Sequence, residues 1–318
     1  MKPVKVGLLG LGNMGLNHLR VLSMLKDIEL CFIFDSDSDK CAQLSKEFDV
    51  PASSDIDNDF KKVNALVVAT PTSTHSSYVM QAHEHVKYLF VEKPLAENLE
   101  KSSEILELAE KFDLKIQVGF IERYNPAIVA LREVLSQSRK ILNIDFTRTN
   151  KLSSRITDVD VIMDLMIHDI DLAVFLNGKV KKINSYGITE DGLISFGRAV
   201  LEHENGVYSS LTASRITEKK IRQITATCED MFVDCNLLSK EILINKQTVA
   251  DQYFDNIFIA SKEETIGLKQ QETLLNELLS FVNFCRGEAD DTIPTAADGV
   301  NAVLIAETIQ QQIPKKIL

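Results

Sequence analysis

Cysteine is scarce in this sequence and follows no pattern. The five cysteines are scattered, odd in number and without a C-x-x-C pair: Cys31, Cys41, Cys228, Cys235 and Cys285. Such usage indicates neither a disulfide framework nor a zinc site, and it favours a reducing cytoplasm. His83 and His85 do not change this, because a helical zinc site needs histidines four residues apart on one face. We therefore expect no metal and a cytoplasmic location.

Long apolar runs and an excess of basic charge are also missing. No apolar run approaches the roughly 20 residues that span a bilayer, and Met1-Lys2-Pro3 leaves no room for a signal peptide before the first strand. The chain has 35 basic and 46 acidic residues, a net charge of -11. This balance argues against a nucleic-acid or anionic-membrane partner. With 318 residues, 45% of them apolar, and no repeats, the chain is expected to form two globular domains.

Three of the few glycines stand close together near the N-terminus. Gly10, Gly12 and Gly15 have the spacing G-x-G-x-x-G, between an apolar run and leucines at helical spacing. The pattern is typical of a strand, a tight turn and a helix whose N-terminus binds a pyrophosphate. Asn13 and Met14 lie within this turn and are predicted to bind the cofactor with the glycines.

An acidic residue supports the dinucleotide interpretation. Asp35 ends the next apolar run, twenty residues beyond Gly15, where a carboxylate would bind the ribose hydroxyls of NAD. No Arg or Lys directly follows Asp35, which favours NAD over NADP, although Lys40 lies nearby. The alternative is a glycine-rich turn in another α/β protein, with Asp35 capping the next helix.

Polar residues follow a third apolar run, Ala65 to Ala69, which is typical of a strand buried on both faces. Ligands of open parallel sheets bind beyond the carboxyl ends of the strands, so Thr70, Pro71 and His75 are predicted to lie beside the cofactor. The alternative is an ordinary helix cap formed by the Thr and Ser residues of this turn.

The next apolar run, Tyr88 to Val91, ends in Glu92 and Lys93. A lysine at the end of a buried strand is unusual, because this side chain normally seeks solvent. Both residues are predicted to lie at the cofactor. Residues 50–52 are expected to form a short strand or a connection, and 115–119 are expected to form a last strand. The first part of the chain is therefore expected to contain some six strands in βαβ order.

The second part of the chain changes to sequential strands. Asn205-Gly206 is a hairpin signal, and strands joined by tight turns predict an antiparallel or mixed sheet. Helices are expected over 126–138, 161–177, 273–286 and 296–312, strands over 144–149 and from 180 onward, and a loop over 150–157.

Asp164 and His168 lie four residues apart on the predicted helix 161–177, and therefore on one face. A carboxylate one turn from an imidazole can fix its tautomer and raise its proton affinity. The alternative is a surface pair without a catalytic role.

Together with the glycine turn and Asp35, Glu92-Lys93-Pro94 makes the chain resemble the glucose-fructose oxidoreductase and inositol dehydrogenase family, Gfo/Idh/MocA, over nearly its whole length. The resemblance implies a Rossmann domain, 1–120, and an α/β domain with a large, open, mostly antiparallel sheet, 121–318, that supports homodimers or homotetramers. It also implies that Lys93 reaches the reacting hydroxyl and that His168, oriented by Asp164, is the catalytic acid or base. Met166 stands where many relatives have a small residue, which leaves the shape of the pocket open.

Four cations gather at Arg215, Lys219, Lys220 and Arg222, and guanidinium groups suit phosphate oxygens. A solvated basic loop is the alternative. This segment, the helix with His168 and Phe120 to Pro126 resemble the branch of the family that acts on UDP-linked amino sugars. The predicted substrate residues are Arg123, Tyr124, Asn125, Arg215 and Arg222. The leading hypothesis is oxidation at C3 of a UDP-N-acetylglucosamine type sugar; the alternatives are a free sugar or inositol dehydrogenase and a catalytically silent dinucleotide-binding regulator.

Overall fold

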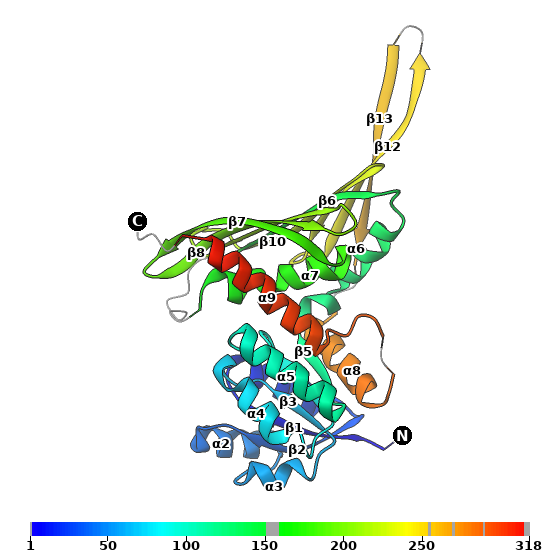
Figure 1. Cartoon of the computed structure of the whole chain (residues 1–318). Helices are drawn as coiled ribbons and strands as arrows, with labels where there is room; N and C mark the ends of the chain where they lie inside the picture. The colour runs from blue at the N-terminus through cyan, green and yellow to red at the C-terminus, as the bar shows by residue number, and fades with distance from the viewer. Residues whose placement is uncertain (1, 151–158, 254–255, 269–270, 289, 315–318) are drawn as a thin grey trace. The chain divides into compact units, whose positions relative to one another are not determined.

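The computed structural model describes residues 2–150, 159–253, 256–268, 271–288 and 290–314 (Figure 1). The chain divides into two compact units. The first comprises Met1–Tyr124 and Glu272–Leu304, and the second comprises Asn125–Gln271 and Ile305–Leu318. None of the described helices is both long and apolar enough to cross a membrane.

A parallel sheet of five strands forms the centre of the first unit. Its order is β2-β1-β3-β4-β5. The strands are β1 (Val4–Leu9), β2 (Ile28–Phe34), β3 (Ala65–Val68), β4 (Tyr88–Glu92) and β5 (Lys115–Gly119). All four residues of β3 are buried, as its continuous apolar run predicts. Because the chain runs from β1 outward to β2 and then returns past β1 to β3, the order reverses at β1 and β3, where such sheets bind ligands.

Two alternatives were open for 50–52, a short strand or a connection, and the structure has the connection, so the sheet contains five strands in place of some six. Ala52 makes only an isolated parallel bridge to Ile33. Pro51 accepts a bond from the Ile33 N–H but has no N–H of its own, so the ladder cannot continue through it.

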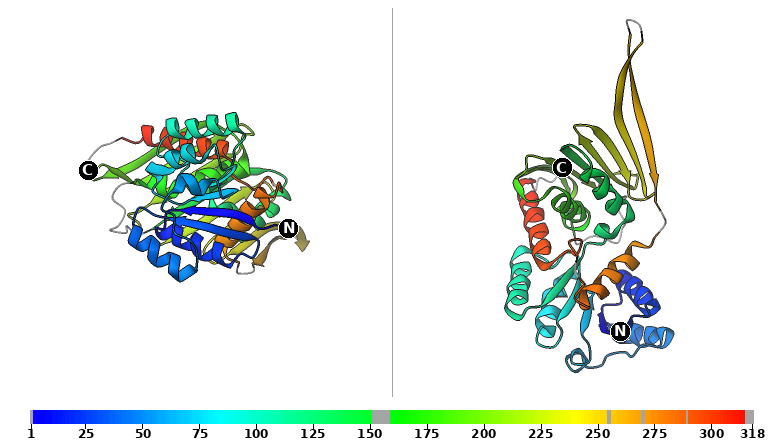
Figure 2. Two further views of the ribbon diagram at one scale, coloured as in Figure 1. Left: turned by 90° about the horizontal axis from the view of Figure 1, so that it is seen from below. Right: turned by 90° about the vertical axis from the view of Figure 1, so that its right-hand side faces the viewer.

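Helices accompany this sheet (Figures 1 and 2). They are α1 (Asn13–Met24), α2 (Ser38–Phe48), α3 (Ile56–Phe60), η1 (Thr72–Thr74), α4 (His75–Ala82), α5 (Leu99–Phe112), η2 (Ile121–Tyr124) and α8 (Thr273–Cys285). The capping residue of α2 is Asp37, whose carboxylate accepts a bond from the Lys40 N–H.

Helix α8 joins the first unit although it lies far away in the sequence. Its buried residues Leu274, Leu278, Phe281 and Val282 belong to the same apolar cluster as the inner residues of β1 and β3. The compact unit therefore includes a segment that the expected domain 1–120 leaves out. That residues 1–120 and 121–318 are the limits of two domains stays a prediction.

A sheet of eight strands forms the second unit, in the order β13-β12-β11-β10-β6-β9-β8-β7. The strands are β6 (Ile141–Thr149), β7 (Val180–Glu190), β8 (Leu193–His203), β9 (Tyr208–Ser214), β10 (Ile221–Cys228), β11 (Met231–Asn236), β12 (Glu241–Tyr253) and β13 (Asn256–Gly267). Every neighbouring pair is antiparallel except β6 and β9. Gly206, at a φ of +81°, lies in the predicted hairpin between β8 and β9. The predicted fold class, a Rossmann sheet plus a large, mostly antiparallel sheet, is confirmed.

Helices α6 (Pro126–Ser136) and α7 (Ile167–Asn177) pack against this sheet (Figure 1). The predicted helix 161–177 begins with a π-helical turn, Ile162–Met166, and ends at Gly178. Helix α9 (Ala296–Gln312) contains the division between the units, after Leu304. Of the loop predicted at 150–157, residues 151–157 lie outside the described residues.

Candidate active site

A cleft of about 470 Å³ lies in the first unit beyond the carboxyl ends of β1, β2 and β3. Seven residues predicted to bind the cofactor line it: Gly10, Gly12, Asn13, Met14, Asp35, Thr70 and Pro71. The lining also contains residues that the sequence analysis did not assign to the cofactor, among them Phe34, Thr74 and Tyr78. Thr74 and Tyr78 are four residues apart, so helical spacing could have added Tyr78 once Thr74 was placed at the turn.

The three glycines of the first turn differ in what they allow. Gly10 has a φ of +86°, and a Cβ on Gly15 would lie 1.9 Å from the Gly10 carbonyl oxygen. The fold itself therefore requires glycine at both positions. A Cβ on Gly12 would meet no atom within 4 Å, so the open space there is available to a ligand. Because Gly12 begins α1 without a side-chain cap, the N–H groups of the first helical turn suit a pyrophosphate.

Asp35 connects this turn to the end of β2. Its Oδ2 accepts a hydrogen bond of 2.6 Å from the Leu11 N–H, and its Oδ1 accepts one of 3.0 Å from the Asp37 N–H. Asp37 and Lys40 line the same cleft, which gives it two carboxylates and one ammonium group. The donors and acceptors around the cleft thus fit a pyrophosphate at α1 and ribose hydroxyls at Asp35.

Two aromatic rings form an apolar part of this cleft. The rings of Phe34 and Tyr78 meet edge to face with centroids 6.4 Å apart. Burial, and then the charge of Asp35, raise the pKa of Tyr78. These rings suit a flat base, while the glycine turn suits phosphates.

Four other residues predicted to bind the cofactor are not part of the lining of this cleft: Gly15, His75, Glu92 and Lys93. The buried His75 ring lies between two carbonyl oxygens, with Nδ1 3.0 Å from that of Pro94 and Nε2 3.0 Å from that of Thr70. Burial lowers the pKa of His75. It fastens the turn after β3 to the turn after β4.

Lys93 is half-buried and directly follows β4. Its N–H donates a bond of 3.2 Å to Oε2 of Glu92, and its peptide bond to Pro94 is cis. The predicted catalytic lysine therefore lies on a turn whose backbone is held at Lys93 by Glu92 and at Pro94 by His75.

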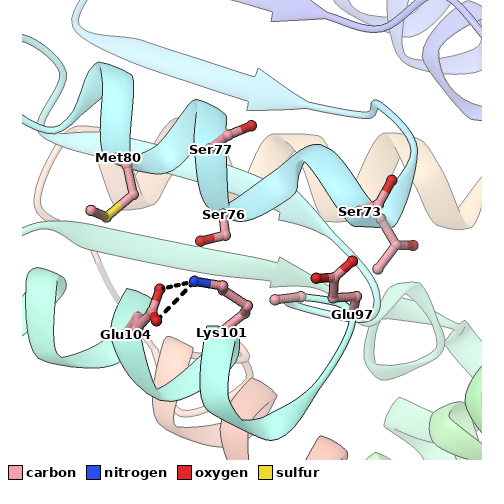
Figure 3. Close-up of a pocket in the computed structure, with 9 residues that line it drawn as sticks. Ser73, Ser76, Ser77, Met80, Glu97, Lys101 and Glu104 are labelled. Carbon is pink, nitrogen blue, oxygen red and sulfur yellow. Dashed lines mark hydrogen bonds and ion pairs between the residues drawn. The ribbon is translucent and has the colours of Figure 1, made fainter.

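A second, smaller hollow of about 260 Å³ lies between α4 and α5 of the same unit (Figure 3). Its polar lining includes Ser73, Ser76, Ser77 and Lys101, and Lys101 is paired with Glu104 at 2.8 Å. None of the residues predicted for the site lines this hollow.

In the second unit, Asp164 and His168 are the two half-buried residues in an otherwise buried segment, 161–173. Both therefore reach the surface of α7 and its π-helical first turn, as their four-residue spacing predicts. Met166 is fully buried, and its methyl group would lie 3.5 Å from a Cβ placed on Gly197. This residue fills the space between the helix and β8.

Arg215 pairs with Asp164 instead of standing open to a phosphate. Its Nη2 lies 2.8 Å from Oδ2 of Asp164, and its Nη1 donates to the Val159 carbonyl oxygen. The side chain of Arg215 is only 5% exposed, so the pair is largely withdrawn from water on the arginine side. The sequence reasoning missed this contact, because Arg215 and Asp164 are brought together only by the sheet.

The remaining predicted substrate residues also contact protein groups. Arg123 is buried and pairs with Asp298 at 3.3 Å, and the Tyr124 hydroxyl accepts a bond of 3.3 Å from Ser280. Asn125 caps α6. Arg222 donates a bond of 2.8 Å to the Thr149 carbonyl oxygen. Among the described residues, no group of three or more His, Cys, Asp or Glu side chains could hold a metal ion.

Sequence profiles of one family match both parts of the chain. Residues 4–120 match the oxidoreductase family with an NAD-binding Rossmann fold, and residues 138–231 match the GFO/IDH/MocA C-terminal domain. The chain belongs to the GFO/IDH/MocA oxidoreductase family. The predicted enzyme class, a dehydrogenase acting on CH–OH groups, is confirmed.

Individual relatives of this GFO/IDH/MocA oxidoreductase include sugar dehydrogenases. It is 26% identical over 312 residues to UDP-N-acetylglucosamine 3-dehydrogenase of Acidithiobacillus ferrooxidans, covering 93% of this chain and 96% of that protein. It is 26% identical over 235 residues to scyllo-inositol 2-dehydrogenase (NAD(+)) of Bacillus subtilis, covering 67% of each. Its fold matches a crystal form of the Acidithiobacillus ferrooxidans enzyme with a TM-score of 0.88 at 23% identity, over 98% of both chains. A levoglucosan dehydrogenase solved with NADH matches with a TM-score of 0.84 at 18% identity, over 98% and 97% of the chains.

Proposed function

We propose that this protein oxidises a secondary hydroxyl of a sugar with NAD⁺, most specifically C3 of a UDP-N-acetylglucosamine type nucleotide sugar. The observation that carries the proposal is the similarity to UDP-N-acetylglucosamine 3-dehydrogenase, which extends over 93% of the chain and so includes both units. The matches to inositol dehydrogenases cover between 55% and 98% of the chain, and the one that covers 98% is 24% identical. They support free inositols or sugars as the second candidate.

We assign the chemistry to three side chains. NAD⁺ held by the glycine turn and Asp35 would supply the hydride acceptor for the carbinol carbon. His168 takes the hydroxyl proton, and Asp164 orients its imidazole. Lys93 donates a hydrogen bond to the substrate oxygen and stabilises its developing negative charge. Holding hydride acceptor and base at one carbon–oxygen unit supplies much of the acceleration.

The substrate assignment is tested by following NAD⁺ reduction with UDP-N-acetylglucosamine, its uronic acid, inositols and free hexoses. The proposal expects turnover with the nucleotide sugars. Turnover with inositol or free hexoses alone would favour the second candidate, and no turnover with any of them would favour a dinucleotide-binding regulator.

For the cofactor we propose NAD in preference to NADP. Two carboxylates and a single ammonium group line the cleft at the ribose end, and Asp35 would repel a 2′-phosphate. Asp35→Asn keeps a side-chain acceptor for the Leu11 N–H but removes the charge. We expect it to lower the NADH to NADPH affinity ratio by about tenfold. An unchanged ratio in binding titrations would contradict this assignment.

We further propose that the open face of the eight-stranded sheet joins subunits into homodimers or homotetramers. Tyr186, Tyr208 and Phe232 share this face by strand register and are 57%, 47% and 41% exposed. Exposed aromatics on one face favour association. Light scattering on the wild type and on Tyr186→Glu tests it, and a wild-type monomer would contradict it.

A further inference from the structure

A ladder of side chains connects β4 to α8 in the first unit. The rings of Tyr88 and Phe284 lie 5.9 Å apart, and those of Phe90 and Phe281 lie 5.6 Å apart. Alternate residues of a strand point to the same face, and residues three or four apart share a helix face. The next step of this ladder brings together Glu92 of β4 and Glu277 of α8.

A histidine from the cofactor-binding helix enters the same place. His18 of α1 is fully buried, and its ring lies 5.1 Å from that of Phe90. Its Nε2 lies 2.7 Å from Oε1 of Glu92. The other carboxylate oxygen of Glu92 accepts the bond from the Lys93 N–H. Glu92 therefore uses one oxygen for α1 and the other for the turn that carries Lys93.

The two buried carboxyl groups differ in their partners. Among the described residues, neither side-chain oxygen of Glu277 has a hydrogen-bond partner, and the residue is fully buried. Burial, followed by the charges of Glu92 and Glu122, raises the pKa of Glu277 well above its usual range. A neutral Glu277 beside a hydrogen-bonded Glu92 is the arrangement that costs the least in desolvation.

Little room is left for Glu92 to move. A Cβ on Gly119 of β5 would lie 2.8 Å from Oε2 of Glu92, so this glycine gives the carboxylate its space. On the other side of Lys93, the His75 ring holds the Pro94 carbonyl oxygen. Side chains from α1, β4 and α4 thus fix the backbone of this turn at Lys93 and Pro94.

From this geometry we infer that Glu92 is a positioning residue for Lys93 and not a cofactor ligand, with His18 as its anchor and Glu277 as a neutral neighbour. This inference rests on the proposed function, in which Lys93 contacts the substrate. It gives buried groups a role in catalysis although they touch neither NAD nor substrate.

The test compares Glu92→Ala, Glu92→Gln and Glu277→Gln with the wild type. Glu92→Ala is expected to lower kcat by about 100-fold, the cost of a small misplacement at a reacting centre. Its affinity for NADH, measured by titration, should stay within about threefold, because the cleft does not include Glu92. Glu92→Gln should recover at least about tenfold of the lost kcat, since its amide oxygen can accept from the Lys93 N–H.

Glu277→Gln is the matched control in the same cluster, because an amide resembles a neutral carboxylic acid in size and charge. It should leave kcat within about twofold of the wild type. Difference infrared spectra supply an independent readout: the carbonyl band of a protonated carboxylic acid should be present in the wild type and absent from Glu277→Gln.

Several outcomes would overturn the inference. The first is a kcat of Glu92→Ala equal to that of the wild type. The second is a loss of NADH affinity in Glu92→Ala as large as its loss of kcat. The third is a loss of kcat in Glu277→Gln as large as that in Glu92→Ala. If Glu92→Ala does not fold, Glu92→Gln must still lower kcat by more than Glu277→Gln does. If the wild type turns over none of the substrates, the proposed function has failed. A crystal structure of Glu92→Ala, which lacks the acceptor for the Lys93 N–H, would then decide against the inference separately if its Lys93 turn had not moved.

Discussion

Lys93 is the single residue whose position, directly after the buried strand β4, most clearly indicated a functional role. A lysine directly after a buried strand is unusual, because its ammonium group normally seeks solvent. In the structure, the turn that carries Lys93 is held by hydrogen bonds between its backbone and the side chains of Glu92 and His75. The sequence indicated the residue from its position, but not the groups that hold it. His75 comes from α4, and His18, which contacts Glu92, comes from α1; no local pattern connects these two histidines to β4.

The lysine itself gives the most direct prediction. Lys93→Ala should lower kcat by about 100-fold or more, because the proposed hydrogen bond to the substrate oxygen is lost. NADH affinity should stay nearly unchanged. Lys101→Ala is a matched control, since Lys101 belongs to the same unit and pairs with Glu104 away from the cofactor cleft. Steady-state kinetics and NADH titration check the result, and full activity of Lys93→Ala would refute the assigned role.

Arg215 gives a second prediction at this scale. Because its guanidinium pairs with Asp164, Arg215→Ala should lower kcat for every accepted substrate by a similar factor, about tenfold, whether or not the substrate carries a phosphate. The loss should not add to that of Asp164→Asn, since both changes break the same pair. A rise in KM that is confined to nucleotide sugars would contradict this prediction and would indicate that Arg215 binds a phosphate of the substrate.

At the scale of elements, regular patterns predicted most strands and helices, including the limits of β5 and α9. Irregular features were missed. The π-helical turn before α7 has the same apolar pattern as an α-helix, so spacing cannot distinguish them. At 50–52 the apolar pattern left a short strand and a connection open. The connection forms, because a proline there has no N–H to donate to a strand ladder.

The glycine turn permits a comparison between two alanine variants. Gly15→Ala should destabilise the first unit by about 1–3 kcal/mol or more, because its Cβ would collide with the Gly10 carbonyl oxygen. Gly12→Ala should leave the melting temperature nearly unchanged, since its Cβ meets no atom. It should nevertheless weaken NADH binding by about tenfold or more, because the methyl group would occupy the place predicted for the pyrophosphate. Calorimetry and NADH titration measure the two effects, and equal melting temperatures for both variants would contradict the explanation.

At the scale of the whole molecule, the prediction of two contiguous domains, 1–120 and 121–318, separated the two sheets correctly. It did not place α8 in the first unit. Helix α8 is an ordinary amphipathic helix in the sequence. Its partner sheet becomes known only when its buried residues are seen in the cluster with β1 and β3. Convergence of Lys93 and His168 on one substrate stays a prediction for the same reason, because local patterns do not specify distant contacts.

Global stability should depend on pH through Glu277. Its pKa in the folded protein is raised above the unfolded value of about 4.5, so the folded state holds a proton that the unfolded state releases. The resulting stability is fully present below about pH 4.5 and is lost as the pH rises towards the folded pKa, by up to about 1.4 kcal/mol per pH unit. Glu277→Gln should lack this slope. Urea unfolding of both proteins from pH 5 to pH 8 checks the difference, and parallel curves would show that Glu277 is not neutral in the folded state.

The late return of α8 has a consequence for biosynthesis. A ribosome makes the five parallel strands first, and all of residues 125–271 must follow before the helix that completes their apolar cluster is translated. Until then, the nascent nucleotide-binding half exposes the surface that Leu278 and Phe281 later cover. This half of the protein therefore reaches its final packing only near the end of translation, and a chaperone that shields newly made chains would find its binding surface there.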